Sequence, residues 1–174
     1  SGVISNYGFL SFLFKGKKSE KDVTDLSSPS SLSEDISNVN AEIVVPLLGD
    51  ETSTEMLVEM ASSINDKSKI NTINLLEVPN QTFLEAIDLN TPASESKKRR
   101  LEKLKKYKNL KISYETIATH DVASSIDNIT GQSKCKWLVM EWDGRENAGI
   151  FVGNPIGWLL RKVNSNLALF KDNG

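Results

Sequence analysis

The chain has 174 residues, enough for one domain and a tail, and its 21 Lys and Arg against 23 Asp and Glu give a net charge of -2. This balance gives no case for nucleic-acid binding, so we expect no nucleic-acid partner. The single cysteine, Cys135, excludes an internal disulfide, and the single histidine, His120, excludes a multi-histidine metal site within one chain. We therefore expect no metal centre.

Residues 1–40 are expected to form a flexible tail or linker. Residues 7–14 (YGFLSFLF) are apolar and aromatic, lysines follow at once, and residues 19–40 are rich in serine, which buries little apolar surface. Two interpretations of the apolar patch stay open. In the first it is an interfacial anchor, or the end of a membrane segment with the lysines on the cytoplasmic side. In the second it packs on its own domain or on a partner chain. The chain begins Ser-Gly without an initiating methionine, so we expect the native protein to extend upstream.

Residues 41–174 are expected to form one α/β domain. A β-branched run predicts a buried first strand, and the turn that follows it carries helix-capping residues. Strands are expected over residues 42–48, 70–78, 110–116, 137–142 and 167–170. Helices are expected over residues 56–64, 94–108, 121–131 and 155–163, with a loop or short helix over 81–91. This alternation implies a five-stranded parallel sheet with helices on both faces, a Rossmann-like α/β fold.

A glycine-rich loop follows the expected fourth strand, where loops of parallel α/β sheets bind phosphates and nucleotides. Glycines let the backbone approach a phosphate closely, and an arginine could add a bidentate contact. The acids Glu141 and Asp143 would repel a phosphate unless a metal ion intervened. The alternative that the glycines only form tight turns stays open. The candidate binding residues are Gly144, Arg145, Gly153 and Asn154.

Eight Lys and Arg residues lie between positions 97 and 108, on the expected second helix. We favour a solvated helix face, balanced by acids elsewhere in the chain. Contact with anionic lipid stays open as the second interpretation, because each basic residue near such a surface contributes about 1 kcal/mol.

No enzymatic activity is expected. His120 and Asp121 are adjacent, but no credible nucleophile lies near them in the sequence. We therefore expect Asp121 to cap a helix.

Several short stretches carry a family resemblance through their order and spacing. They are residues 43–46, Glu55, Ala61, residues 143–145, residues 153–154 and residues 166–170. Over residues 41–170 the chain resembles the universal stress protein domain. The resemblance implies the adenine nucleotide α-hydrolase-like version of the fold predicted above.

ATP-binding members of that family carry an acidic residue at the end of the first strand, then Gly-x-x-Gly, nine residues and Gly-Ser/Thr. Here Leu48 stands at the acidic position and Glu141 at the first glycine, whereas Gly144 matches the second glycine. Eight residues separate Gly144 from Gly153, and Asn154 replaces the hydroxyl residue. The resemblance thus implies a degraded site with no cofactor, and ATP or another nucleotide remains the candidate ligand.

Members of this family also commonly form a homodimer through the last strand. The resemblance places that interface at Leu167, Ala168, Leu169 and Phe170.

The sequence Met-Glu-Trp-Asp-Gly at 140–144, followed by Gly-Asn-Pro-Ile-Gly-Trp-Leu-Leu at 153–160, resembles a narrower group. These are stress-protein-like domains fused behind transporters of the amino acid–polyamine–cation superfamily, including amino acid permeases and prokaryotic cation-chloride cotransporters. We therefore expect a non-catalytic regulatory and dimerisation domain on the cytoplasmic side of the cell membrane, partnered by the membrane part of its own transporter. The alternative is a free-standing cytosolic universal stress protein that binds ATP or another nucleotide.

Overall fold

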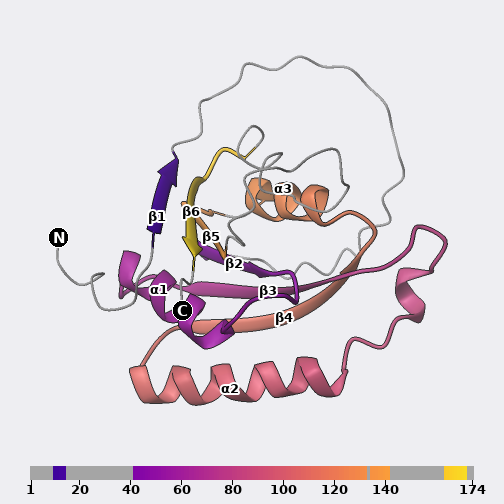
Figure 1. Cartoon of the computed structure of the whole chain (residues 1–174), viewed down its shortest axis with the longest axis horizontal. Helices are drawn as coiled ribbons and strands as arrows, with labels where there is room; N and C mark the ends of the chain where they lie inside the picture. The colour runs from indigo at the N-terminus through magenta and orange to yellow at the C-terminus, as the bar shows by residue number, and fades with distance from the viewer. Residues whose placement is uncertain (1–9, 15–40, 133, 142–162, 172–174) are drawn as a thin grey trace.

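The structure, a computed structural model, describes residues 10–14, 41–132, 134–141 and 163–171, and all that follows concerns these residues. Within them the strands form a six-stranded sheet in the order β1-β6-β5-β2-β3-β4 (Figure 1). The strands are β1 (Leu10–Phe14), β2 (Ile43–Leu47), β3 (Ile70–Glu77), β4 (Ile112–Thr119), β5 (Trp137–Glu141) and β6 (Asn166–Lys171). The helices are α1 (Thr54–Ile64), the 3-10 turn η2 (Leu84–Ala86), α2 (Pro92–Lys108) and α3 (Val122–Gln132).

The first expected strand is the centre of the parallel part of the sheet. All five residues of β2 are buried, and β2 pairs in parallel with β3 on one side and with β5 on the other. A β-branched, fully apolar strand suits this place because both faces of a parallel sheet are covered by helices. Strands β6, β5, β2, β3 and β4 run parallel, as the sequence predicted.

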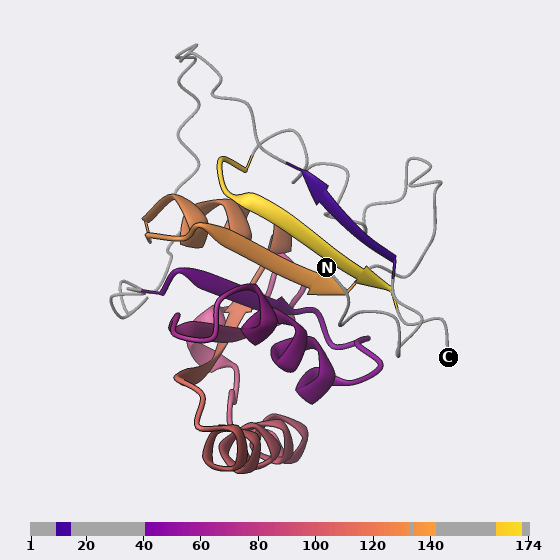
Figure 2. The same ribbon diagram turned by 90° about the vertical axis from the view of Figure 1, so that its left-hand side faces the viewer.

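Helices cover both faces of the sheet, so that two apolar layers form (Figure 2). Alternate residues of β2 point to opposite faces. Val45 packs on one face with Leu57 of α1 and Leu101 of α2. Val44 packs on the other face with Ile126 of α3.

The helix boundaries follow local capping chemistry. The Ser53 hydroxyl accepts a hydrogen bond from the Met56 amide at 3.2 Å and so begins α1. The Asp121 carboxylate accepts from the Ser124 amide at 3.1 Å, which confirms the expected cap of α3. Helix α2 begins at Pro92, two residues before the expected start, because the first helical turn tolerates proline.

Strand β4 is longer at its carboxyl end than the sequence predicted. The expected strand covered residues 110–116, whereas β4 runs from Ile112 to Thr119. All eight of its residues pair with β3. Most of them are only half-buried, so their apolar pattern is weak and the strand end is set by pairing with β3.

The sixth strand lies within the region expected to be a tail. Strand β1 pairs antiparallel with β6, from Leu10 opposite Lys171 to Phe14 opposite Leu167. The described part of the apolar patch, residues 10–14, therefore packs on its own domain, which is one of the alternatives left open above. The sheet is consequently mixed, with five parallel strands and one antiparallel edge strand, where the sequence predicted only the five. The expected helix at 155–163 lies outside the described residues except for its last position.

Candidate functional site

The sheet has a topological switch point between β2 and β5. The chain continues from β2 outward to β3, but from β5 outward to β6 in the opposite direction. In open α/β sheets the crevice outside the carboxyl ends of two such strands is the usual place of a ligand. Here the crevice is bordered by the loop at residues 48–53, which joins β2 to α1, and by Glu141 at the end of β5.

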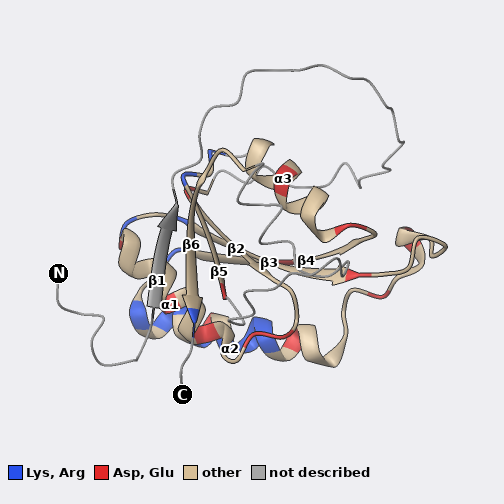
Figure 3. Cartoon of the chain, turned by 45° about the horizontal axis from the view of Figure 1, so that its top comes forward, with Lys and Arg blue, Asp and Glu red and all other residues tan. Residues whose placement is uncertain are grey.

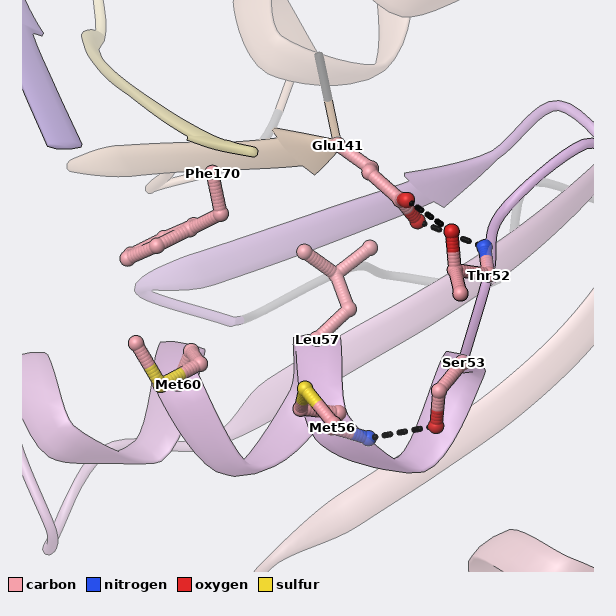
Figure 4. Close-up of a pocket in the computed structure, with 7 residues that line it drawn as sticks. All are labelled: Thr52, Ser53, Met56, Leu57, Met60, Glu141 and Phe170. Carbon is pink, nitrogen blue, oxygen red and sulfur yellow. Dashed lines mark hydrogen bonds between the residues drawn. The ribbon is translucent and has the colours of Figure 1, made fainter. Parts of the chain in front are cut away.

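A carboxylate bridges this crevice. One Glu141 oxygen accepts a hydrogen bond from the Thr52 amide at 2.9 Å, and the other accepts from the Thr52 hydroxyl at 2.7 Å (Figure 4). The two residues come from elements on opposite sides of the switch point. The ends of β2 and β5 are therefore joined by the protein's own charged group.

A second carboxylate closes the same loop. The Glu51 side chain turns back and accepts hydrogen bonds from the amide of Leu48 and, at 3.0 Å, from the amide of Gly49. Gly49 has φ of 103°, a left-handed conformation that glycine adopts readily. The amides of Leu48, Gly49 and Thr52, which could otherwise hold an anion, thus donate to carboxylates of the same chain.

A shallow pocket lies beside the Glu141–Thr52 pair, between α1 and the ends of β5 and β6. It encloses about 240 Å³, including space open to solvent, which is below the usual range of small-molecule sites. Figure 4 shows methionine, leucine and phenylalanine side chains along one side and the Glu141 carboxylate at the rim. The pocket suits a small apolar group better than a phosphate. Its lining residues are Thr52, Ser53, Met56, Leu57, Met60, Glu141 and Phe170.

Solved structures with a similar arrangement of strands and helices are known. No protein-family model matches the sequence, and no curated protein matches it. A universal stress protein from Archaeoglobus fulgidus superposes with a TM-score of 0.53 at 13% identity, over 74% of this chain and 97% of that one. A universal stress protein in complex with cAMP gives 0.52 at 15% identity, over 75% and 97%. The chain has the universal stress protein fold.

A third similar structure is a universal stress protein from Archaeoglobus fulgidus DSM 4304, with a TM-score of 0.53 and 12% identity. It covers 75% of this chain but 44% of its own length. The predicted fold class is thereby confirmed. At these identities the likeness concerns the fold alone.

The residues named from the family's ATP motif are only partly placed within this universal stress protein fold. Gly144, Arg145, Gly153 and Asn154 lie outside the described residues, so their binding role stays a prediction. Glu141, which stands at the first glycine position, lies at the switch point. Leu48, which stands at the acidic position, is half-buried and packs against the apolar layer under α3.

The sequence did not reveal Glu51 and Thr52 as the groups that close the loop. The available signal is the polar turn directly after a buried strand, which by itself predicts helix capping alone. Capping is indeed present, through Ser53. The carboxylate contacts depend on the loop conformation and on a partner 89 residues away, so residue spacing could not show them.

The expected dimer residues Leu167, Ala168, Leu169 and Phe170 are all buried. Strand β6 pairs with β5 on one side and with β1 on the other, so both of its edges are used within one chain. The homodimer through this strand stays a prediction.

The remaining polar candidates have local roles. The His120 ring nitrogen Nδ1 lies 3.3 Å from the carbonyl oxygen of Val78, beside the cap of α3. Nowhere in the described ranges do three His, Cys, Asp or Glu side chains group as a metal ion would require. None of the helices described is long and apolar enough to cross a membrane.

Proposed function

We propose that this universal stress protein-like domain is a non-catalytic regulatory and dimerisation domain on the cytoplasmic side of a membrane transporter of the amino acid permease or cation-chloride cotransporter type. The observation that supports a non-catalytic role is the pair of hydrogen bonds that Thr52 donates to the Glu141 carboxylate across the switch point. The family resemblance of residues 140–144 and 153–160 supports the attachment to a transporter.

Two carboxylates make the described part of the crevice unsuited to a phosphate. A phosphate at this loop would have to displace Glu51 or Glu141 from the amides that they accept, and would then lie beside a negative charge. The Thr52 hydroxyl donates to the Glu141 carboxylate, but in the proposed role this pair holds the loop closed and activates no nucleophile. In this role the domain therefore supplies binding surfaces and no chemistry.

A dimer formed through the outer edge of β6 requires that β1 leave that edge. One strand edge accepts one partner, and the outer edge of β6 pairs with β1 of the same chain. In the proposed dimer, β1 leaves this edge so that a second copy can occupy it. The N-terminal segment would then control assembly.

The alternative is a free-standing universal stress protein that binds ATP or another nucleotide. The observation in its favour is the shared fold with a universal stress protein in complex with cAMP. For a phosphate to enter at the described loop of this chain, Glu141 would first have to release Thr52.

Fractionation of native cells tests the proposal. An antibody raised against this domain is used on blots of the membrane pellet and of the soluble fraction. A membrane band much larger than the 19.3 kDa of this chain supports a transporter domain. A soluble band near 19.3 kDa contradicts it and favours the free-standing protein.

Calorimetry separates the alternative from the proposal. ATP with Mg²⁺, and separately cAMP, are titrated into the purified chain. Heat of binding that disappears in Gly144→Val or Gly153→Val supports the nucleotide-binding protein. Absence of heat at millimolar nucleotide argues against it.

A further inference from the structure

Helix α2 concentrates the positive charge of the chain. It contains eight basic and two acidic residues, a net charge of +6. The whole chain has a net charge of -2, so the rest of the chain carries -8. Figure 3 shows the basic segments gathering on α2. Such separation of charge indicates a surface with a distinct electrostatic role.

Part of this charge secures α2 against the domain. The Arg100 guanidinium lies 3.2 Å from the carboxylate of Glu55, and the Lys108 ammonium lies 3.2 Å from that of Glu59. Both acids belong to α1. These ion pairs join the two helices along the side of α2 that faces the domain.

Of the six remaining basic residues of α2, four form what we call the α2 basic face. Among the described residues they have no ion pair, and all four are exposed. Their spacing places them on neighbouring turns of one side of the helix, away from the buried Leu101. Glu102 is also exposed on this side and offsets one charge. The α2 basic face consists of Lys98, Arg99, Lys103 and Lys106.

An aromatic ring stands at the carboxyl end of this helix. Tyr107 is 84% exposed, and the Lys108 ammonium lies 5.7 Å from the centre of its ring. Tyrosine combines an apolar ring with a polar hydroxyl, and such side chains are enriched at the level of lipid headgroups.

We propose that the α2 basic face docks on an anionic lipid surface. Figure 2 shows α2 end-on at the outside of the described domain, so one plane can meet the helix along its whole length. A plane that touches only this side keeps the acidic residues of the other described elements at a distance, where salt screens their repulsion beyond roughly 10 Å. A nucleic-acid strand that wrapped around the domain would instead meet those acids.

This inference goes beyond the proposed function, because a lipid-docking helix requires neither a transporter nor a dimer. The attraction is weak for one domain in solution, since each basic residue strengthens binding only about fivefold. It is strengthened further when another part of the protein holds the domain near a membrane, which raises its local concentration.

Co-sedimentation with vesicles tests the proposal. The purified chain is mixed with phosphatidylcholine vesicles, either pure or containing roughly a third phosphatidylserine. We expect binding only to the anionic vesicles, and we expect it to fall as salt is raised. The triple variant Lys98→Gln/Lys103→Gln/Lys106→Gln should bind on the order of a hundredfold more weakly.

A matched control removes the same charge elsewhere. Lys67, Lys69 and Lys134 are exposed and lie in the loops that enter β3 and β5. Their triple exchange to Gln should leave vesicle binding close to that of the parent chain. Thermal unfolding by circular dichroism checks that both variants fold.

Three outcomes would overturn the proposal. The first is equal binding to neutral vesicles, and the second is an equal loss in the control variant. The third is a duplex DNA fragment that binds more tightly than the vesicles and loses binding with the α2 triple variant, which would make nucleic acid the partner. None of these results bears on the transporter proposal, which the cell fractionation tests.

Discussion

Glu141 and Thr52 are 89 residues apart in the sequence, yet the carboxylate of one accepts hydrogen bonds from both the amide and the hydroxyl of the other. The contact joins the end of β5 to the loop that begins α1. It occupies the place where proteins with this sheet topology usually hold a ligand.

The Glu141–Thr52 contact should stabilise the fold modestly. We expect Thr52→Val or Glu141→Gln to lower the free energy of unfolding by about 1 kcal/mol, because hydrogen bonds to a charged but solvent-exposed group contribute little more. Urea denaturation of the single and double variants measures the coupling between the two side chains. Glu102→Gln, on an exposed acid of α2, serves as a control. Additive effects in the double variant would show that the contact contributes no coupling energy.

The same carboxylate should oppose nucleotide binding. Glu141→Ala removes a negative charge and frees the Thr52 amide, so any affinity for cAMP or ATP should rise in this variant. Calorimetry on the parent chain and the variant measures the difference. If the parent chain binds cAMP and the variant does not, the carboxylate is instead a ligand-binding group.

Ser53 should contribute to stability through the cap of α1. Ser53→Ala removes the acceptor of the Met56 amide, and a lost cap costs about 1 kcal/mol. Ser63→Ala is the matched control on the same helix, because the Ser63 hydroxyl is exposed and donates only to the carbonyl oxygen of Glu59. Thermal unfolding compares the two variants. Equal shifts in both would contradict a specific capping role for Ser53.

Glu42 should give the stability an acid dependence. A hydrogen bond from the Ser68 hydroxyl, and then the Lys136 ammonium, hold the pKa of the Glu42 carboxyl below its ordinary value. Its contribution is therefore present above a pH of about 4.5, the ordinary value, and is lost as the pH falls through the lowered pKa. The parent chain should unfold less readily than Glu42→Gln at neutral pH, and the difference should vanish in acid. A difference that is the same at both pH values would refute the linkage.

Strand β1 should limit assembly through β6. Removal of residues 1–14 leaves the outer edge of β6 without its partner, and unpaired edges recruit other chains. We expect a larger dimer fraction for the shortened chain by light scattering at matched concentration. Truncation is preferred to a charged substitution within β6, because Ala168→Arg would place a charge in the core and lower the stability of the domain itself. A shortened chain that stays monomeric would argue against the dimer through β6.

The parallel sheet could be predicted because its strands are apolar runs bounded by turns. Strands buried on both faces of a sheet need such continuous apolar runs, so the pattern is easy to recognise. The helix caps could be predicted as well, because each depends only on residues directly before its helix. The length of β4 was not predictable, because its half-buried residues carry a weak pattern and β3 fixes its end.

The position of β1 and the closure of the crevice could not be derived from sequence patterns. An apolar aromatic segment such as residues 10–14 has the same composition whether it enters lipid or adds to a sheet, so only the pairing with β6 decides between them. Likewise Glu141 was identified as unfavourable for phosphate, but its partner Thr52 becomes a neighbour only when β2 and β5 pair.

The antiparallel attachment of β1 also has a mechanical consequence. Tension applied to the chain ahead of Leu10 is transmitted first to the pair between Leu10 and Lys171, at one end of the β1–β6 ladder. If the chain is also held beyond Lys171, the load enters at that end and opens the ladder one pair at a time, whereas β6 itself is held by parallel pairing along its other edge. The domain would therefore yield a short length of chain under load while its five-stranded centre stays folded.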